Sequence, residues 1–126
     1  IGFPATNPIT AAANDFTGAG ANNVLVFTAD ATNGSFVQRL RLNPAGTCVA
    51  SVLRIFINNG STNGTAANNC CIGQISLPAT TASAVAALVE LDYPLNIALP
   101  PGYRIYVGLG TAVSAGWIVC TIAGNY

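Results

Sequence analysis

The chain has 126 residues, a length that suits a single domain. Charged residues make up only 6% of it, whereas they make up about 25% of an ordinary soluble domain. Four Arg balance four acidic residues, and His, Lys and Met are absent. This balance excludes a basic surface for nucleic acid or anionic lipid, and it leaves few arrangements for acid–base catalysis or metal binding.

Residues 1–22 are rich in Ala, Asn, Thr, Pro and Gly and have weak periodicity, so we expect an extended N-terminal arm or a loosely packed first strand. The first residue, Ile1, is not a start residue, which leaves open the removal of a preceding segment. Residues 23–126 form the second predicted unit, the folded domain.

From Asn23 onward, short apolar runs rich in β-branched and aromatic residues alternate with turn signals every ~8–12 residues, which is typical of an all-β sandwich or barrel. We therefore predict a single antiparallel β-sandwich, jelly-roll-like or immunoglobulin-like, of about eight short strands. The predicted strands are Val24–Ala29, Phe36–Leu42, Cys48–Ile57, Cys70–Leu77, Ala84–Leu91, Leu95–Leu99, Tyr103–Leu109 and Trp117–Ala123.

The longest apolar runs are far shorter than the roughly 20 residues of a membrane-spanning helix, so we expect no membrane insertion. Disorder is excluded because the composition is hydrophobic at 52%, with no net charge. The dominant residues are Ala (21), Asn (13), Gly (13) and Thr (12). A surface of neutral polar groups suits packing against neighbours, because charges cost free energy to desolvate at a contact.

Alternation along the predicted strands predicts apolar side chains on both faces of several of them. In the run 36–42, strict alternation places Phe36, Gln38, Leu40 and Leu42 on one face and Val37, Arg39 and Arg41 on the other. In a small antiparallel domain one face is normally solvated, so a second apolar face indicates a cover supplied by the N-terminal arm or by another subunit.

The four cysteines do not predict a metal or catalytic site. Zinc ligands usually come as closely spaced Cys pairs with Cys or His partners, and the adjacent Cys70 and Cys71 would point to opposite faces of a strand. A catalytic thiol needs a base, and there is no His. Buried free thiols are the favoured interpretation; the alternative is a disulfide from Cys48 to Cys70 or Cys71. No cofactor is predicted.

The charged residues are predicted to be pairing groups. Arg39, Arg41, Arg54 and Arg104 all lie within predicted strands, and the planar guanidinium group binds carboxylates bidentately at interfaces. Glu90 and Asp92 would share one face of an extended segment. We expect them to be solvated, or to pair with Arg39 and Arg41 across strands or subunits.

Three Asn-x-Ser/Thr sequences, at Asn33, Asn59 and Asn63, are also Asn-Gly dipeptides. Hairpin turns explain them better than glycosylation, for which a secretory pathway is required. Tyr93, Tyr103, Tyr106 and Trp117 could line a sugar-binding platform, but core and interface roles are commoner for aromatic residues in strands.

Several phrases of the sequence have a family likeness: the run from Arg54 to Asn69 (RIFINNGSTNGTAANN), LPATT from Leu77, PLNIALPPGY from Pro94, LGTAVSAGW from Leu109 and IAGNY from Ile122. They resemble small structural proteins of tailed bacteriophages over roughly residues 44–126, leaving the N-terminal arm unmatched. The resemblance carries no functional residues over.

The resemblance implies a virion component, a capsid decoration (cement) protein on the surface of a phage head, whose partner is the major capsid protein or another virion protein. It also implies a homo-oligomer, with a trimer favoured. Another extracellular assembly subunit, from a filament or surface layer, and a carbohydrate-binding module remain as alternatives. An enzyme is the least favoured class.

Overall fold

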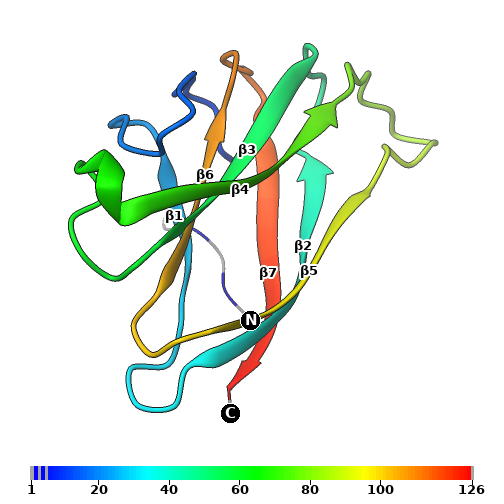
Figure 1. The fold of residues 1–126 in the computed structure, drawn as a ribbon. Helices are drawn as coiled ribbons and strands as arrows, with labels where there is room; N and C mark the ends of the chain where they lie inside the picture. The colour runs from blue at the N-terminus through cyan, green and yellow to red at the C-terminus, as the bar shows by residue number, and fades with distance from the viewer. Residues whose placement is uncertain (1, 3, 5, 126) are drawn as a thin grey trace.

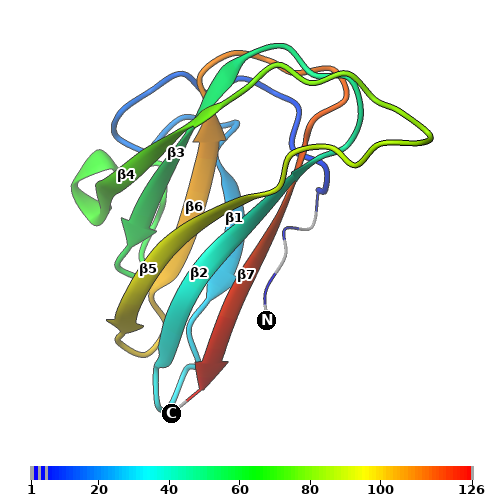
Figure 2. The same ribbon diagram turned by 90° about the vertical axis from the view of Figure 1, so that its right-hand side faces the viewer.

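The computed structural model describes residues 2, 4 and 6–125, and within them two antiparallel sheets pack face to face (Figures 1 and 2). The strands are β1 (Val24–Thr28), β2 (Ser35–Pro44), β3 (Ser51–Asn58), β4 (Asn69–Leu77), β5 (Leu91–Leu99), β6 (Arg104–Leu109) and β7 (Trp117–Asn125), with one 3-10 turn, η1 (Ala66–Asn68). One sheet has the order β1-β6-β3-β4 and the other β5-β2-β7. The predicted antiparallel β-sandwich is confirmed.

Turn dipeptides end the strands where the sequence predicts. Between β1 and β2, the backbone N–H of Gly34 donates to the carbonyl of Asp30 (3.0 Å), and Gly34 has a φ of 74°. That conformation favours glycine, and a side chain at this position would also collide with the carbonyl of Leu99. The Asn33-Gly34 sequence therefore has a structural role in the turn.

One predicted strand, Ala84–Leu91, is wrong. Only Leu91 belongs to a strand, as the first residue of β5, and the rest is a loop. The Ser83 hydroxyl accepts hydrogen bonds from the backbone N–H groups of Val85 and Ala86 (3.2 Å each) and bends the chain. Such local side-chain bonds compete with strand pairing, and within the described residues no strand lies beside this segment.

A β-bulge overturns the predicted faces of β2. The register of β2 against β7 moves from Val37 opposite Ala123 to Arg39 opposite Ile122, so Gln38 is an extra residue. An extra residue reverses the alternation of side chains beyond it. Val37 and Leu40 are both buried in consequence, while Phe36 and Gln38 are exposed.

The core lies between the sheets and includes a residue of the N-terminal arm. Ile9 is 1% exposed and packs in the same cluster as Trp117. The two residues exchange backbone hydrogen bonds of 2.9 and 3.0 Å, and two further bridges join Gly2 to Thr121 and Ala12 to Leu109. The arm thus lies along the outer edge of β7 and then crosses to the end of β6.

The arm also covers the outer face of the four-stranded sheet. Phe56 is fully buried but lies outside the cluster between the sheets. A Cβ added at Gly18 would lie only 2.9 Å from the Phe56 ring, so the arm passes directly over this side chain. The arm of the same chain therefore covers the outer face of β3, and it is one of the two covers expected from the sequence for a second apolar face.

We predict that Ile9→Ala lowers the free energy of unfolding by about 2–5 kcal/mol, because it removes a buried side chain and leaves a cavity. Thr10→Ala, at the exposed neighbouring position, is the matched control and should change it by less than about 0.5 kcal/mol. Urea denaturation followed by tryptophan fluorescence measures both. Equal effects of the two substitutions would show that the arm is not part of the folding unit.

Candidate assembly surfaces

Four of the predicted pairing residues form one cluster on the outer face of the three-stranded sheet. Arg41 on β2 lies directly opposite Asp92 on β5, with its Nε 3.2 Å from the Asp92 Oδ1. Arg41 also pairs with Glu90, and Arg39 Nε lies 3.6 Å from the same Asp92 oxygen. The pairing joins neighbouring strands of one chain, so these residues need no second subunit to balance their charge.

Arg54 contacts neutral side chains instead of carboxylates. It lies on β3, is 9% exposed, and donates to Gln74 Oε1 from Nε and to Asn14 Oδ1 from Nη1, both at 3.2 Å. Its guanidinium carbon also lies 4.0 Å from the centre of the Phe16 ring, a cation–π arrangement. Arg54 thus fastens the arm to the sheet. Arg104 on β6 forms no ion pair among residues 2, 4 and 6–125.

The remaining acidic residues organise loops, a role that the sequence analysis missed. The Asp15 carboxylate accepts hydrogen bonds from the backbone N–H groups of Thr17, Gly18 and Gly20 and from the Asn23 side chain, at 2.7–3.2 Å. Asp30 accepts two bonds in the next turn. The signal was present: Asp followed by Thr and Gly two and three residues later is typical of such turns.

All four cysteines are free thiols, which contradicts the alternative of a disulfide. The favoured interpretation of buried thiols is correct for Cys48 and wrong for Cys70 and Cys71, which are exposed. Cys70 and Cys71 pair with Ile57 and Phe56 at one end of the β3–β4 hairpin. Cys48 precedes Ser51 at the other end, about 20 Å away at the usual rise of a strand, and its thiol lies against the carbonyl of Gly116. A disulfide requires Cα atoms within about 7 Å.

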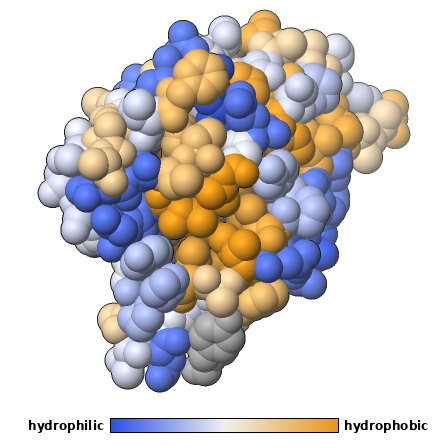
Figure 3. Space-filling model, in the orientation of Figure 1, coloured by the Kyte–Doolittle hydropathy of each residue, from blue (hydrophilic) through white to orange (hydrophobic). Residues whose placement is uncertain are grey.

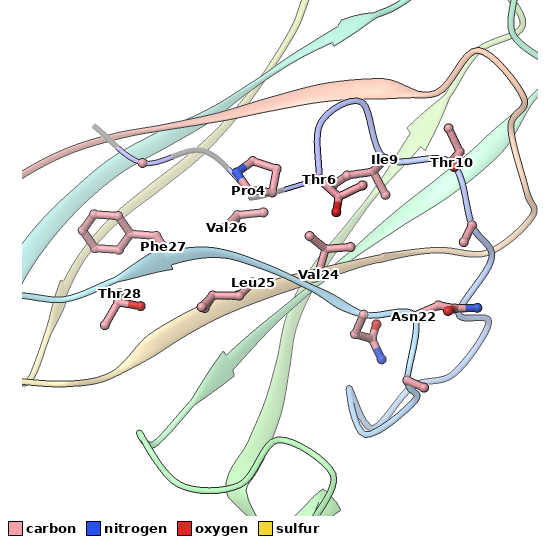
Figure 4. Close-up of a pocket in the computed structure, with 14 residues that line it drawn as sticks. Pro4, Thr6, Ile9, Thr10, Asn22, Val24, Leu25, Val26, Phe27 and Thr28 are labelled. Carbon is pink, nitrogen blue, oxygen red and sulfur yellow. The ribbon is translucent and has the colours of Figure 1, made fainter.

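A groove runs between the arm and β1 (Figure 4). It has a volume of about 810 Å³ and is bounded by Pro4, Thr6 and Ile9 from the arm and by the free edge of β1. None of its lining residues is charged. Among the described residues, β1 pairs only with β6, and its other edge faces the groove. Val26 is an extra residue in the β1–β6 ladder.

A second apolar surface lies between β4 and β5, the edge strands of the two sheets; we call it the β4–β5 seam. Figure 3 shows hydrophobic side chains gathered in the middle of this face. The seam consists of partly buried residues that pack against the core: Ile57, Ile72, Ile75, Tyr93, Leu95 and Ile97. Tyr93 reaches across to Gly73, where any Cβ would collide with its hydroxyl.

The loop between β4 and β5 projects from the molecule, on the right-hand side of Figure 1. Residues 81–87 are all exposed, and Val85 is 97% exposed. Residues 78–89 contain no charged side chain. Several hydrogen bonds tie the base of the loop to the body of the protein. Thr80 and Cys48 form an antiparallel bridge with backbone bonds of 2.9 and 3.1 Å, and the backbone N–H of Ala82 donates to Thr47 Oγ1 at 3.0 Å.

Within the described part of the chain, no group of three or more Cys, Asp and Glu side chains could hold a metal ion. The same residues contain no helix that is long and apolar enough to cross a membrane. Comparison with models of protein families, with curated proteins and with solved structures finds no match.

Tyr93, Tyr103 and Trp117 do not form an aromatic platform: Trp117 is fully buried and the two tyrosines pack against the core.

We predict that Arg54→Ala destabilises the fold by about 2–3 kcal/mol, because it removes two hydrogen bonds and the contact with Phe16 and leaves Asn14 and Gln74 without a partner. Arg41→Ala is the matched control: its side chain is 34% exposed, and such pairs contribute about 1 kcal/mol or less. Thermal and urea unfolding measure both. A larger loss for Arg41→Ala would contradict this assignment of roles.

The cysteines should react with a thiol reagent in three classes. Cys70 and Cys71 are exposed, Cys120 is partly buried and Cys48 is buried. We expect two fast reactions in the native protein, a slower third, and a fourth only after unfolding, since a reagent must reach the sulfur. Mass spectrometry after timed alkylation assigns each site. Fewer than four reactive thiols after unfolding without a reductant would reveal a disulfide.

Proposed function

We propose that this protein is a structural virion component, a capsid decoration protein that binds the outside of a phage head and stabilises contacts between capsid proteins. The observation that carries the proposal is the β4–β5 seam: an apolar surface, open along two free strand edges, on a protein with only eight charged side chains. Partly exposed apolar side chains beside unpaired strand edges are typical of contact sites. The sequence resemblance supplies the identity of the partner.

The distribution of charge supports a stable attachment more than a transient one. Seven of the eight charged residues are engaged inside the chain: four in the cluster of β2 and β5, Arg54 in its contact with the arm, and Asp15 and Asp30 in loops. The surface that is left is mostly neutral, so little electrostatic repulsion opposes close packing of many copies. On this proposal the protein forms a homo-oligomer, in the form of a trimer as the resemblance implies.

The test is binding to heads of the encoding phage assembled without this protein. We expect the purified chain to co-sediment with these heads at saturating, symmetric occupancy in cryo-electron microscopy. Leu95→Ser, in the β4–β5 seam, should weaken binding roughly tenfold or more through lost apolar burial. Ile118→Ser, on the outer face of β7 at 38% exposure, is the matched control and should bind normally.

Absence of binding to heads would contradict the proposal, as would equal loss in the two variants. Helical filaments of the purified chain would favour the alternative of a filament subunit. Specific binding in a glycan array would favour the carbohydrate-binding module.

A further inference from the structure

Two parts of this fold lack a strand partner: the exposed run Ala84–Val89 and the groove beside β1. The run Ala84–Val89 has the composition of a strand, yet all its residues except the half-buried Leu88 are exposed, and no described strand lies beside it. The groove beside β1 lacks a strand. Its walls are largely apolar, and among the described residues no strand pairs with this edge of β1, although Gly2 of the arm lies close to Val26 and Phe27. If the run were to bind in such a groove as an added strand, its side chains would be buried and the edge of β1 would be paired.

The groove has the form of a strand acceptor. β1 offers a five-residue edge, Val24–Thr28, which at the usual rise spans about 17 Å. Apart from the carbonyl of Val26, which accepts from the Thr121 hydroxyl at 3.4 Å, the described structure shows no hydrogen bond on this edge. Leu25, 38% exposed, and the half-buried Val24 and Phe27 present apolar surface along the groove.

The loop segment matches this acceptor in charge, length and pattern. Neither Ala84–Val89 nor the lining of the groove contains a charged residue, so docking desolvates no charge. In an extended conformation, Val85, Ala87 and Val89 would share one face. Val85 and Val89 are among the most exposed large apolar residues of the described chain, at 97% and 42%.

The segment does not reach the groove of its own chain. In Figure 1 the loop projects on the right, whereas β1 lies on the left side of the molecule. The loop is held at its base through Thr80 and Ala82. Only a second copy can bring the segment to the groove.

We propose that residues 84–89 of one copy insert beside β1 of another copy and complete its sheet as an added strand. Main-chain hydrogen bonds to the free edge then supply affinity, and Val85 and Val89 occupy the apolar groove. The contact joins two different surfaces, so repeating it produces a closed ring or a filament; a three-membered ring is the trimer of the proposed function. The inference rests on that function and names its contact between copies.

Disulfide trapping tests the contact. In a background of Cys70→Ser, Cys71→Ser and Cys120→Ser, one variant carries Val85→Cys and a second carries Leu25→Cys. After mixing and oxidation with glutathione disulfide, we expect a covalent 25–85 dimer at least about tenfold faster than random collision allows. Phe36→Cys replaces Leu25→Cys as the control, because Phe36, on the outer face of β2, is 39% exposed and thus close to the 38% of Leu25.

Self-association gives an independent measurement. Leu25→Asp and Val85→Asp should each weaken it by at least roughly tenfold, since each places a charge in an apolar contact. Phe36→Asp and Val49→Asp, at exposed positions of the same kind, are the controls and should leave it unchanged. Sedimentation velocity measures the association, and thermal unfolding checks that every variant is folded.

The proposal is overturned if wild-type protein stays monomeric at high concentration, if Val85→Cys reacts equally with the two partners, or if the four charged variants associate alike. The same variants are also assayed on phage heads. Variants that lose self-association while wild-type protein fails to bind heads support the inference and contradict the proposed function. If both head binding and self-association survive Leu25→Asp and Val85→Asp, the result supports the proposed function and contradicts this inference.

Discussion

The pairing of Ile9 with Trp117 is the contact on which the arrangement of this molecule depends. Two backbone hydrogen bonds and the burial of both side chains fix the arm at the edge of β7. From that point the chain crosses to the end of β6 and returns over β3, where Gly18 and Phe16 cover Phe56 and Arg54. A segment with little regular structure of its own therefore closes one strand edge and one sheet face.

Some strand edges of the two sheets are not covered by the arm. A sandwich of two open sheets has four outer strands, and the order of the sheets makes these β1, β4, β5 and β7. The arm bridges β7 at two points. In the described part of the chain, no strand pairs with the outer edges of the other three, which flank the groove and the β4–β5 seam. Natural proteins usually protect such edges with charged residues. Here Asp15 and Asp30 lie in loops, Arg54 and Arg104 lie on the inner strands β3 and β6, and the other four charged residues form the cluster of β2 and β5.

Much of the fold could be predicted from the sequence because its signals are local. Short β-branched runs and Asn-Gly or Pro-Gly dipeptides located seven strands within a few residues of their ends. The errors arose where the conformation of a residue depends on segments that are distant in the sequence. The bulge at Gln38 has no local signature, and it reversed the faces of β2. Ala84–Leu91 has the composition of a strand, but a strand exists only beside a partner. Pairing of Arg41 with Asp92 was anticipated as one option, whereas the distance from Cys48 to Cys70 depends on the whole hairpin.

Because the groove and the seam contain no charged side chain, salt and temperature would affect contacts made through them differently. Debye screening weakens attraction between charged surfaces as salt is added, but apolar burial has no such dependence. The lining of the groove contains no side chain that titrates between mild acid and mild alkali. Added salt would therefore not weaken contacts made through such a surface by screening, whereas cooling, which weakens the hydrophobic effect, would weaken them.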